Sequence, residues 1–316
     1  MFIDDDARPR CVSVATAASR MRVRAGDFPV DRIGEPVALA VLVGGTGGFY
    51  RPAGAAMFVD RAGNRAGSLS SGCVDADVAL HAAEVGRTGV ARTVRYGDGS
   101  PFMDIRLPCG GGIDILVLPA SRAELSPVRA AIAARQACTL RLGATGISAE
   151  PAGVARVTVE IVPDPRFVVI GNGPEAATFA SLAACLGYET VLLSAGGGAA
   201  GIAVDKAVAA MPFTGPDALA AVPVDAHTAG VLFFHDHDAE AEILQCLVQT
   251  EAFYLGAQGS RRTAIRRAER LRTLGIAETQ IARVRGPIGA VPAARDPRTL
   301  AASVLAEVLG EAQARL

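Results

Sequence analysis

Short apolar runs separated by glycine-rich turns predict strands through the first third of the chain. The longest run, PVALAVLV at residues 36–43, is nearly continuous and predicts a buried strand. The polar DRAGN sequence at residues 60–64 is typical of a turn between antiparallel strands. Four shorter runs predict further strands: residues 55–59, 93–96, 103–107 and 113–118.

A helix is predicted directly after the glycine–serine loop GSLSSG at residues 67–72. Its apolar face repeats at helical spacing and comprises Val74, Val78, His81 and Val85. Because His81 lies on this face, we expect it to be a core histidine. The strands and this helix together predict a mixed α/β domain over residues 1–121.

Residues 122–165 are expected to connect this domain to a second one. Ser126 followed by Pro127 is typical of an N-cap with proline at the first helical position, and predicts a helix that begins at Pro127 and continues over residues 128–137. Strands are predicted at residues 138–142 and 156–162. The Pro-Asp-Pro sequence that follows disfavours helical structure and marks the domain boundary.

Strands and helices alternate strictly in the remainder of the chain. The strands are predicted at residues 167–170, 190–193, 230–234 and 252–256. One helix is predicted to follow the first of these strands and to end near residue 186. Three further helices are predicted at residues 239–248, 260–274 and 297–309. Alternation of this kind predicts a parallel sheet with helices on both faces. The expected fold class is therefore α/β, with a mixed N-terminal domain and a Rossmann-like domain at residues 166–316.

Composition and charge exclude several classes of protein. The 316 residues suffice for two domains, and 31 basic residues nearly balance 32 acidic ones. No bulk positive field therefore favours nucleic acid or an anionic membrane. Apolar runs stop well short of the ~18 residues of a membrane span, and the start of the chain lacks the pattern of a secretory signal. We expect a cytoplasmic protein that binds neither nucleic acid nor membrane.

Two of the six cysteines stand in glycine-rich surroundings. Cys73 begins the helix that follows the GSLSSG loop, where free backbone N–H groups favour a thiolate. Cys109 precedes Gly110 and Gly111, where the backbone can approach a ligand closely. The absence of a CxxC pair indicates reduced thiols, and the other cysteines are expected to be small buried hydrophobes: Cys11, Cys138, Cys185 and Cys246.

The GNGPEA sequence at residues 171–176 follows a predicted strand and opens a helix, as a dinucleotide-binding turn does. Pro174 lacks a backbone N–H, and Glu175 places negative charge where a phosphate would lie. Ser194 stands where an acidic residue would bind a ribose. Two interpretations stay open: a turn that binds NAD(P) through Gly171 and Gly173, as in an oxidoreductase, and a purely structural turn.

Two more polar groups follow predicted strands of the parallel sheet, at the edge where such folds bind ligands. His235 and Asp236 favour contact with a substrate or cofactor over a metal, because no third ligand is clustered nearby. The sequence Gly259-Ser260-Arg261-Arg262 begins a helix with Ser260 as its cap, and its free N–H groups and guanidinium groups suit a phosphate or carboxylate. The alternative is a solvated basic helix face, beside which the GPIG loop at residues 286–289 is expected to pack.

The order of these motifs resembles the XdhC and CoxI family of molybdenum-hydroxylase accessory proteins from about residue 34 to residue 310. The motifs that carry the resemblance are GGFYRPAG at 47–54, GSLSSGCVD at 67–75, LPCGG at 107–111, YLGAQGSRR at 254–262 and GPIG at 286–289. The resemblance implies an XdhC/CoxI-like N-terminal domain and an XdhC-type Rossmann domain at the C-terminal end.

The resemblance also implies a function, that of a maturation factor rather than an enzyme. Such proteins bind the molybdenum cofactor, support the exchange of its oxo ligand for sulfur with a cysteine desulfurase, and deliver it to a xanthine, aldehyde or carbon monoxide dehydrogenase. Cys73 and Cys109 are expected to contact molybdenum or to hold labile sulfur. Arg261, Arg262 and the Ser260 amide are expected to hold the pterin phosphate.

Other possibilities follow from the same residues. The cofactor is expected between the two domains, and self-association into a homo-oligomer is compatible with the sequence. An NAD(P)-dependent oxidoreductase is the alternative function, and a scaffold that binds the hydroxylase without a cofactor is a third. The remaining expected cofactor contacts are Gly110, Gly111, Gly171, Gly173, His235, Asp236 and Gly259.

Overall fold

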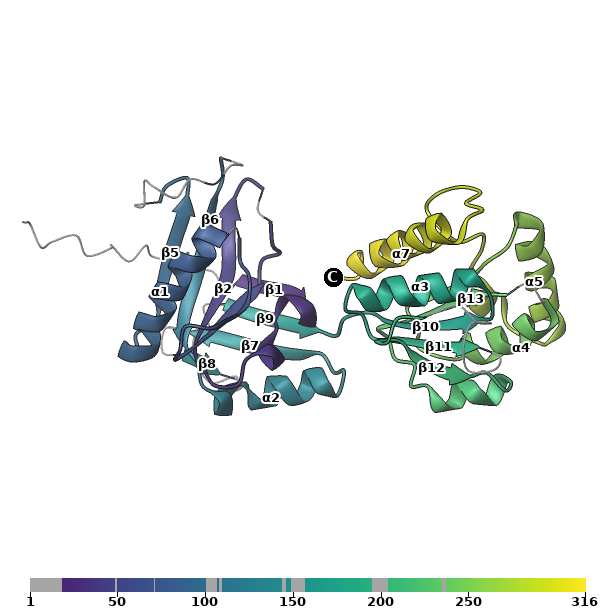
Figure 1. Cartoon of the computed structure of the whole chain (residues 1–316), viewed down its shortest axis with the longest axis horizontal. Coiled ribbons are helices and arrows are strands. Elements are labelled where there is room, and N and C mark those ends of the chain that lie inside the picture. Colours follow the sequence, from purple (N-terminus) through teal and green to yellow (C-terminus); the bar gives the residue numbers. More distant parts are fainter. Residues whose placement is uncertain are drawn as a thin grey trace, which may run out of the picture. The chain divides into compact units, whose positions relative to one another are not determined.

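The chain forms two compact units, Met1–Pro163 and Asp164–Leu316 (Figure 1). The computed structural model describes residues 19–48, 50–70, 72–100, 107, 110–143, 146–148, 157–194, 204–234 and 237–316. The division falls within the Pro-Asp-Pro sequence at residues 163–165. Residues 122–165 were expected to connect two domains; the part up to Pro163 belongs to the first unit and contributes a helix and strands to it.

The first unit is built on an antiparallel sheet with strand order β4-β3-β2-β6-β5. Its strands are β2 Pro36–Thr46, β3 Ala56–Asp60, β4 Arg65–Gly67, β5 Arg92–Gly97 and β6 Gly112–Pro119. The predicted runs are confirmed, except that residues 103–106 lie outside the described residues. Helix α1, Gly72–Thr88, covers one face through buried Val74, Val78 and Val85, as its spacing predicted.

A second sheet, with strand order β1-β9-β7-β8, packs on the other face. Its strands are β1 Ser19–Arg24, β7 Cys138–Gly143, β8 Gly146–Ser148 and β9 Val157–Val162. β1 pairs in parallel with β9, although their sequences are far apart. The shared core includes an edge-to-face contact between Phe28 and Phe58, with ring centroids 5.3 Å apart.

Helix α2 covers Arg122–Ala133, so the predicted start at Pro127 and the predicted end at residue 137 are both wrong. Ser121 is the N-cap, and its hydroxyl and the Glu124 carboxylate form a reciprocal capping box. This box satisfies two backbone N–H groups, those of Ser121 and Glu124. A cap formed by the Ser126 side chain alone would satisfy one. Pro127 consequently lies inside the helix.

The second unit contains one sheet of parallel strands in the order β12-β11-β10-β13-β14-β15. The strands are β10 Arg166–Gly171, β11 Thr190–Ser194, β12 Ala209–Pro212, β13 Thr228–Phe233, β14 Tyr254–Ala257 and β15 Val284–Arg285. This arrangement confirms the α/β fold class and the Rossmann-like sheet. The two edge strands, β12 and β15, were not predicted because each is short.

Helices cover both faces of this sheet (Figure 1). On one face lie α3, Pro174–Cys185, and α7, Pro297–Gln313. On the other lie α4, His237–Leu247, α5, Arg261–Thr273, and the short α6, Glu278–Ile281. The predicted helices are thus confirmed, with boundaries shifted by a few residues.

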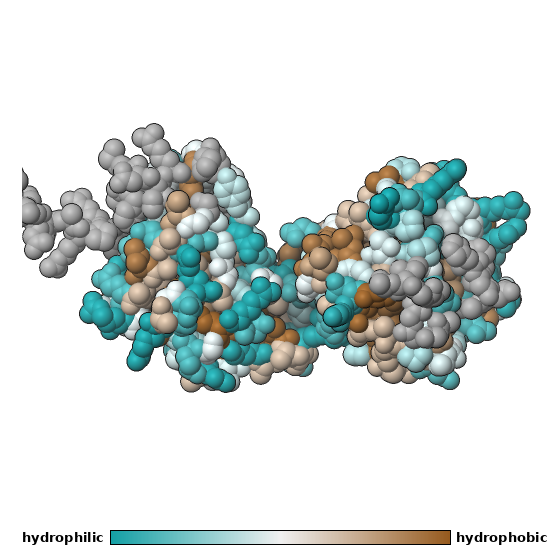
Figure 2. Space-filling view, viewed as in Figure 1, coloured by the Kyte–Doolittle hydropathy of each residue, from teal (hydrophilic) through white to brown (hydrophobic). Residues whose placement is uncertain are grey.

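The expected burial of Cys185 and Cys246 is wrong, since both thiols are exposed. Each follows apolar residues that bury the opposite side of its helix, namely Ala183 and Ala184 in α3 and Ile243 and Leu244 in α4. The surface in Figure 2 mixes hydrophilic and hydrophobic residues. Among the described residues, no helix is long and apolar enough to cross a membrane.

Candidate functional site

A buried carboxylate organises the loop that leads to Cys73. Asp75 is 8% exposed and accepts hydrogen bonds from Ser68 Oγ at 2.6 Å, Leu69 N at 3.0 Å and Ser70 N at 3.1 Å. These donors close the GSLSSG loop onto the first turn of α1. The Cys73 thiol, two residues before Asp75, is exposed at the start of the helix.

Arg51 joins this loop to the second glycine motif, GGFYRPAG. Its Nε donates to the Ser68 carbonyl oxygen at 3.2 Å, and its Nη2 lies 3.3 Å from Asp27 Oδ1. Two of the motifs that sequence analysis treated separately are therefore adjacent in the structure. Arg51 was not among the predicted site residues, because an isolated arginine in a loop carries no spacing signal.

A pocket of about 330 Å³ lies where β5 ends and β6 begins. The described residues that line it are Gly97, Asp98, Gly99, Leu107, Gly110 and Gly111. We call this the glycine pocket. Gly110 and Gly111 were predicted site residues, and both line it. Cys109 lies outside the described residues, and in the sequence it stands between two lining residues, Leu107 and Gly110.

Glycine is required at position 111 because the end of β2 packs against it. A β-carbon there would lie 2.1 Å from the Thr46 carbonyl oxygen. The Thr46 hydroxyl also accepts a hydrogen bond of 3.1 Å from Gly112 N. The main chain at Gly111 and Gly112 is thus held against the end of β2 with no side chain between them.

Arg95 holds the surrounding loops together. Its Nη1 lies 2.8 Å from Asp114 Oδ2, and its Nε donates to the Asp98 carbonyl oxygen at 2.7 Å. A weaker contact of 3.4 Å joins Nη2 to the Thr46 hydroxyl. Since this guanidinium group has protein partners, its role is to shape the pocket.

The Cys73 helix and the glycine pocket meet at the same end of the sheet. Asp77 lies one helical turn after Cys73, and its carboxylate accepts a hydrogen bond of 2.6 Å from the Tyr96 hydroxyl. Tyr96 directly precedes Gly97, which lines the pocket. The helix runs along the sheet in Figure 1 with its first turns near the end of β5. The Tyr96–Asp77 hydrogen bond therefore links the helix that carries Cys73 to the strand that ends at Gly97.

His81 continues this polar face of α1 and is half-buried rather than a fully buried core residue. Its Nε2 lies 3.4 Å from Asp77 Oδ2, and its Nδ1 lies 3.3 Å from Arg92 Nη1. Burial lowers the pKa of His81, an effect that the Asp77 charge opposes and the Arg92 charge reinforces. His81 therefore belongs to a polar network behind the site.

The glycine turn of the second unit has a clear structural role. A β-carbon at Gly171 would lie 2.4 Å from the Phe233 carbonyl oxygen, so glycine allows β10 and β13 to approach closely. Gly173 is the N-cap of α3 and provides no side-chain cap. Pro174 is the first residue of the helix, and Ser194 is fully buried at the end of β11.

Ser260 caps α5, as predicted, and its hydroxyl accepts a hydrogen bond of 3.2 Å from Thr263 N. Arg261 and Arg262 follow it and are exposed. The GPIG loop packs beside this helix, as expected, because a β-carbon at Gly286 would lie 3.7 Å from that of Ala264. Ser260 and the two arginines therefore lie at the carboxyl edge of the parallel sheet.

Arg267 fixes this edge from within, a role that sequence analysis missed. Its side chain is 5% exposed, and its Nε lies 2.5 Å from Glu240 Oε1 in α4. Its Nη2 donates to the Gln258 carbonyl oxygen at 2.7 Å, just before Gly259. Helix α5 contains many arginines. The one sequence feature that indicates burial of Arg267 is its spacing of four residues from Leu271, which places both on the same side of the helix.

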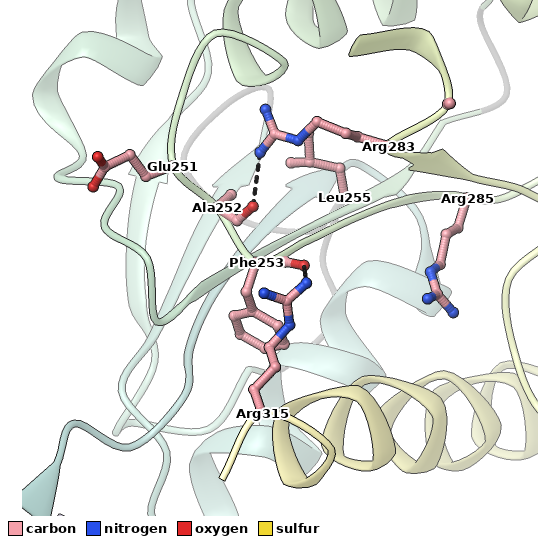
Figure 3. A pocket seen from close by; sticks show the side chains of 8 residues that line it. Glu251, Ala252, Phe253, Leu255, Arg283, Arg285 and Arg315 are labelled. Carbon is pink, nitrogen blue, oxygen red and sulfur yellow. Dashed lines mark hydrogen bonds between the residues drawn. The ribbon is translucent and has the colours of Figure 1, made fainter. Parts of the chain in front are cut away.

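A second pocket, of about 310 Å³, lies at the opposite, amino edge of β14 and β15 (Figure 3). Three arginines line it, and each has protein partners. Arg283 donates to the carbonyl oxygens of Val248, Thr250 and Ala252, and Arg315 donates to that of Phe253. Arg285 lies 2.8 Å from Glu311 Oε1. These contacts tie the end of α4 and α7 to the sheet, which is a structural task.

The remaining predicted residues, His235 and Asp236, lie outside the described residues. α4 begins at His237, directly after them. Within the described part of the chain, no group of three or more His, Cys, Asp and Glu side chains is placed to hold a metal ion.

The sequence matches two family models, described as the XdhC and CoxI family over residues 31–97 and the XdhC Rossmann domain over residues 167–308. It is 36% identical over 284 residues to the molybdenum cofactor insertion chaperone PaoD of Escherichia coli, covering 87% of this chain and 83% of PaoD. It is also 24% identical over 317 residues to a probable xanthine dehydrogenase subunit of Bacillus subtilis, covering 87% of this chain and 93% of that protein.

The fold is shared with a solved structure. A crystal structure of a xanthine dehydrogenase from Bacillus halodurans superimposes with a TM-score of 0.72 at 21% identity, covering 92% of this chain and 95% of that one. The resemblance inferred from the motifs is thus confirmed by whole-chain similarity, and this chain belongs to the XdhC and CoxI family.

Proposed function

We propose that this chain is a molybdenum cofactor insertion chaperone, which binds the cofactor as cargo and delivers it to a molybdenum hydroxylase of the xanthine, aldehyde or carbon monoxide dehydrogenase type. The observation that carries the proposal is the 36% identity to PaoD along 83% of that chaperone. The chain acts in this proposal as a maturation factor, without catalytic turnover.

Cys73 and Cys109 are the proposed contacts to molybdenum or to labile sulfur. Sulfur ligands suit a soft metal, and the exposed Cys73 thiol is accessible to a bound cofactor and to a persulfide donor such as a cysteine desulfurase. The glycine pocket supports the proposal, because Gly110 and Gly111 present backbone without side chains beside the position of Cys109.

The carboxyl edge of the second unit is the proposed phosphate contact. The Ser260 hydroxyl is engaged by Thr263, so the groups proposed to hold the pterin phosphate are the Ser260 amide and the guanidinium groups of Arg261 and Arg262. The other proposed cofactor contacts in this unit are Gly171, Gly173, His235, Asp236 and Gly259.

The test is cofactor retention after purification from molybdenum-replete cells, measured as the fluorescence of released, oxidised pterin. We expect Cys73→Ala and Cys109→Ala to lose retention. The matched controls Cys185→Ala and Cys246→Ala remove exposed thiols on other helices and should retain pterin. Absence of pterin from the parent protein, with no binding of added cofactor, contradicts the proposal. Single Cys variants that still mature the hydroxylase favour a scaffold without cofactor.

The alternative, an NAD(P)-dependent oxidoreductase, rests on the Rossmann-like sheet and on the glycine turn at Gly171 and Gly173. Pro174 and Glu175 in the first turn of α3 oppose a bound pyrophosphate, since one lacks an N–H and the other is negatively charged. We therefore expect titration with NADH to leave the nucleotide fluorescence unchanged. A saturable change in that fluorescence favours the oxidoreductase.

A further inference from the structure

Helix α5 exposes arginines that no acid neutralises within the described part of the chain. Arg262, Arg266 and Arg270 recur every four residues and so line one side of the helix over about 12 Å. All three are exposed. We call them the arginine stripe. The buried side of the same helix carries Arg267 and Leu271, so the stripe faces away from the core.

Other arginines in this unit contrast with the stripe because they have acidic partners. Arg267 lies 2.5 Å from Glu240 Oε1, Arg272 lies 2.5 Å from Glu278 Oε1, and Arg285 lies 2.8 Å from Glu311 Oε1. Where a guanidinium group stabilises this unit it has a close partner, a carboxylate in these three cases and main-chain carbonyl oxygens for Arg283 and Arg315. The stripe therefore serves something other than the fold of this unit.

The helix is less stable for carrying the stripe. Like charges four residues apart repel each other on a helix, and positive charge in the first turn opposes the helix dipole. The first turn of α5 contains no acidic residue, and Glu269 is the single acid among its thirteen residues. A negatively charged partner would remove this repulsion.

The chemistry of the stripe favours a protein partner. Ile265, between Arg262 and Arg266, is 60% exposed, and arginine beside an exposed apolar side chain is typical of protein interfaces. The stripe is longer than one small anion. The net charge of the chain is -1, which disfavours the extended positive field used for nucleic acid or membranes. We propose that the arginine stripe and Ile265 form a docking site for an acidic face of a partner protein.

This docking site goes beyond the proposed cofactor binding and can be tested separately. Arg266 and Arg270 are not among the proposed cofactor contacts, so the double variant R266E/R270E leaves those contacts unchanged. The matched control is R61E/R65E, which reverses two exposed arginines around the turn between β3 and β4 in the other unit. Both variants alter the net charge of the chain equally.

The experiment measures binding of a labelled, glutamate-rich peptide with one central leucine by fluorescence anisotropy. We expect saturable binding by the parent and the control, about tenfold weaker binding by R266E/R270E, and weakening of parent binding by salt. Ile265→Ser should weaken binding independently of salt. Circular dichroism of each variant verifies that α5 stays folded.

Two results would overturn the proposal. One is that the parent and R266E/R270E bind the peptide with equal affinity, or that neither binds it. The other is a preference of the stripe for single-stranded DNA or phosphatidylglycerol vesicles over the peptide, which would identify a phosphate surface instead. Pterin retention measured on the same samples separates failure of the docking site from failure of the cofactor site.

Discussion

The Tyr96 hydroxyl donates a hydrogen bond of 2.6 Å to Asp77, and this bond joins helix α1, which carries Cys73 in its first turn, to the strand that ends at the glycine pocket. Burial and the adjacent carboxylate raise the pKa of Tyr96 above its usual value, so the phenol stays protonated and remains a donor. This contact between residues distant in the sequence therefore adds a polar link to the apolar packing of α1 on the sheet.

Tyr96→Phe removes this donor and leaves the ring in place. We expect the free energy of unfolding to fall by about 1–3 kcal/mol, since the bond is made to a charged acceptor, and pterin retention to fall as well. Urea unfolding and pterin fluorescence measure the two effects. Tyr254→Phe is the matched control, because that hydroxyl donates to Glu307 at 2.8 Å in the other unit. Equal retention by both variants would contradict the link between Tyr96 and the site.

Gly111→Ala is expected to disrupt the glycine pocket. Its β-carbon would lie 2.1 Å from the Thr46 carbonyl oxygen, so the backbone of β2 or of the LPCGG motif must move. The expected outcome is a loss of pterin retention with a lower melting temperature. Gly48→Ala is the control in the neighbouring loop, where a β-carbon meets no atom within 4 Å. Retention by Gly111→Ala at the Gly48→Ala level would show that this close approach is dispensable.

Asp75→Asn tests the loop before Cys73. The substituted amide group cannot accept all the hydrogen bonds that the carboxylate accepts from Ser68, Leu69 and Ser70. We expect faster hydrogen exchange at the Leu69 and Ser70 amides and faster alkylation of Cys73, because the loop opens more often. Asp60→Asn is the control, because Asp60 accepts hydrogen bonds from the Ala62 and Asn64 amides in the turn between β3 and β4. It should change hydrogen exchange in that turn alone. Unchanged exchange at Leu69 in Asp75→Asn would refute this role.

Much of the fold could be predicted because long apolar runs and alternating elements have a clear period, as in β2 and in the second unit. The short strand β1 has no such signal, and its pairing with β9 depends on residues more than a hundred positions away. At α2, two N-cap signals competed, and the capping box of Ser121 and Glu124 prevailed over Ser126-Pro127.

The candidate site could be predicted one motif at a time. Cys73, Gly110 and Ser260 follow from local glycine, serine and helix-start patterns. Side-chain contacts such as that between Arg267 and Glu240, 27 residues apart, have no local pattern. Arg267 therefore could not be recognised from the sequence, and the structure buries it under the edge that carries Ser260.

His81 predicts a dependence of stability on acid. Its pKa is lowered from 6.5 in the folded protein, chiefly by burial, so the unfolded chain binds the proton first as the pH falls. The contribution of His81 to the free energy of unfolding is therefore fully present above pH 6.5 and is lost as the pH falls below that value. Asp77 and Glu84 favour the charged ring and Arg92 opposes it, so the net effect is a balance that burial decides.

His81→Gln should remove this dependence. We expect the parent to lose more stability than the variant between about pH 7.5 and about pH 5.5, because the variant has no proton to bind at this site. Urea midpoints at the two pH values measure the difference. An equal or larger loss in His81→Gln would show that other groups govern the acid response of the unit.

The Arg267–Glu240 pair predicts a non-additive response at the edge that carries Ser260. Arg267→Met removes the guanidinium group beside the Glu240 carboxylate, which is 2% exposed, and should cost about 3–5 kcal/mol of unfolding free energy. Glu240→Gln is destabilising for the converse reason. The double variant removes both charges and should be more stable than the sum of the single losses predicts, although the bond from Arg267 to the Gln258 carbonyl is still lost. Additive losses in urea unfolding would show that the two charges act independently.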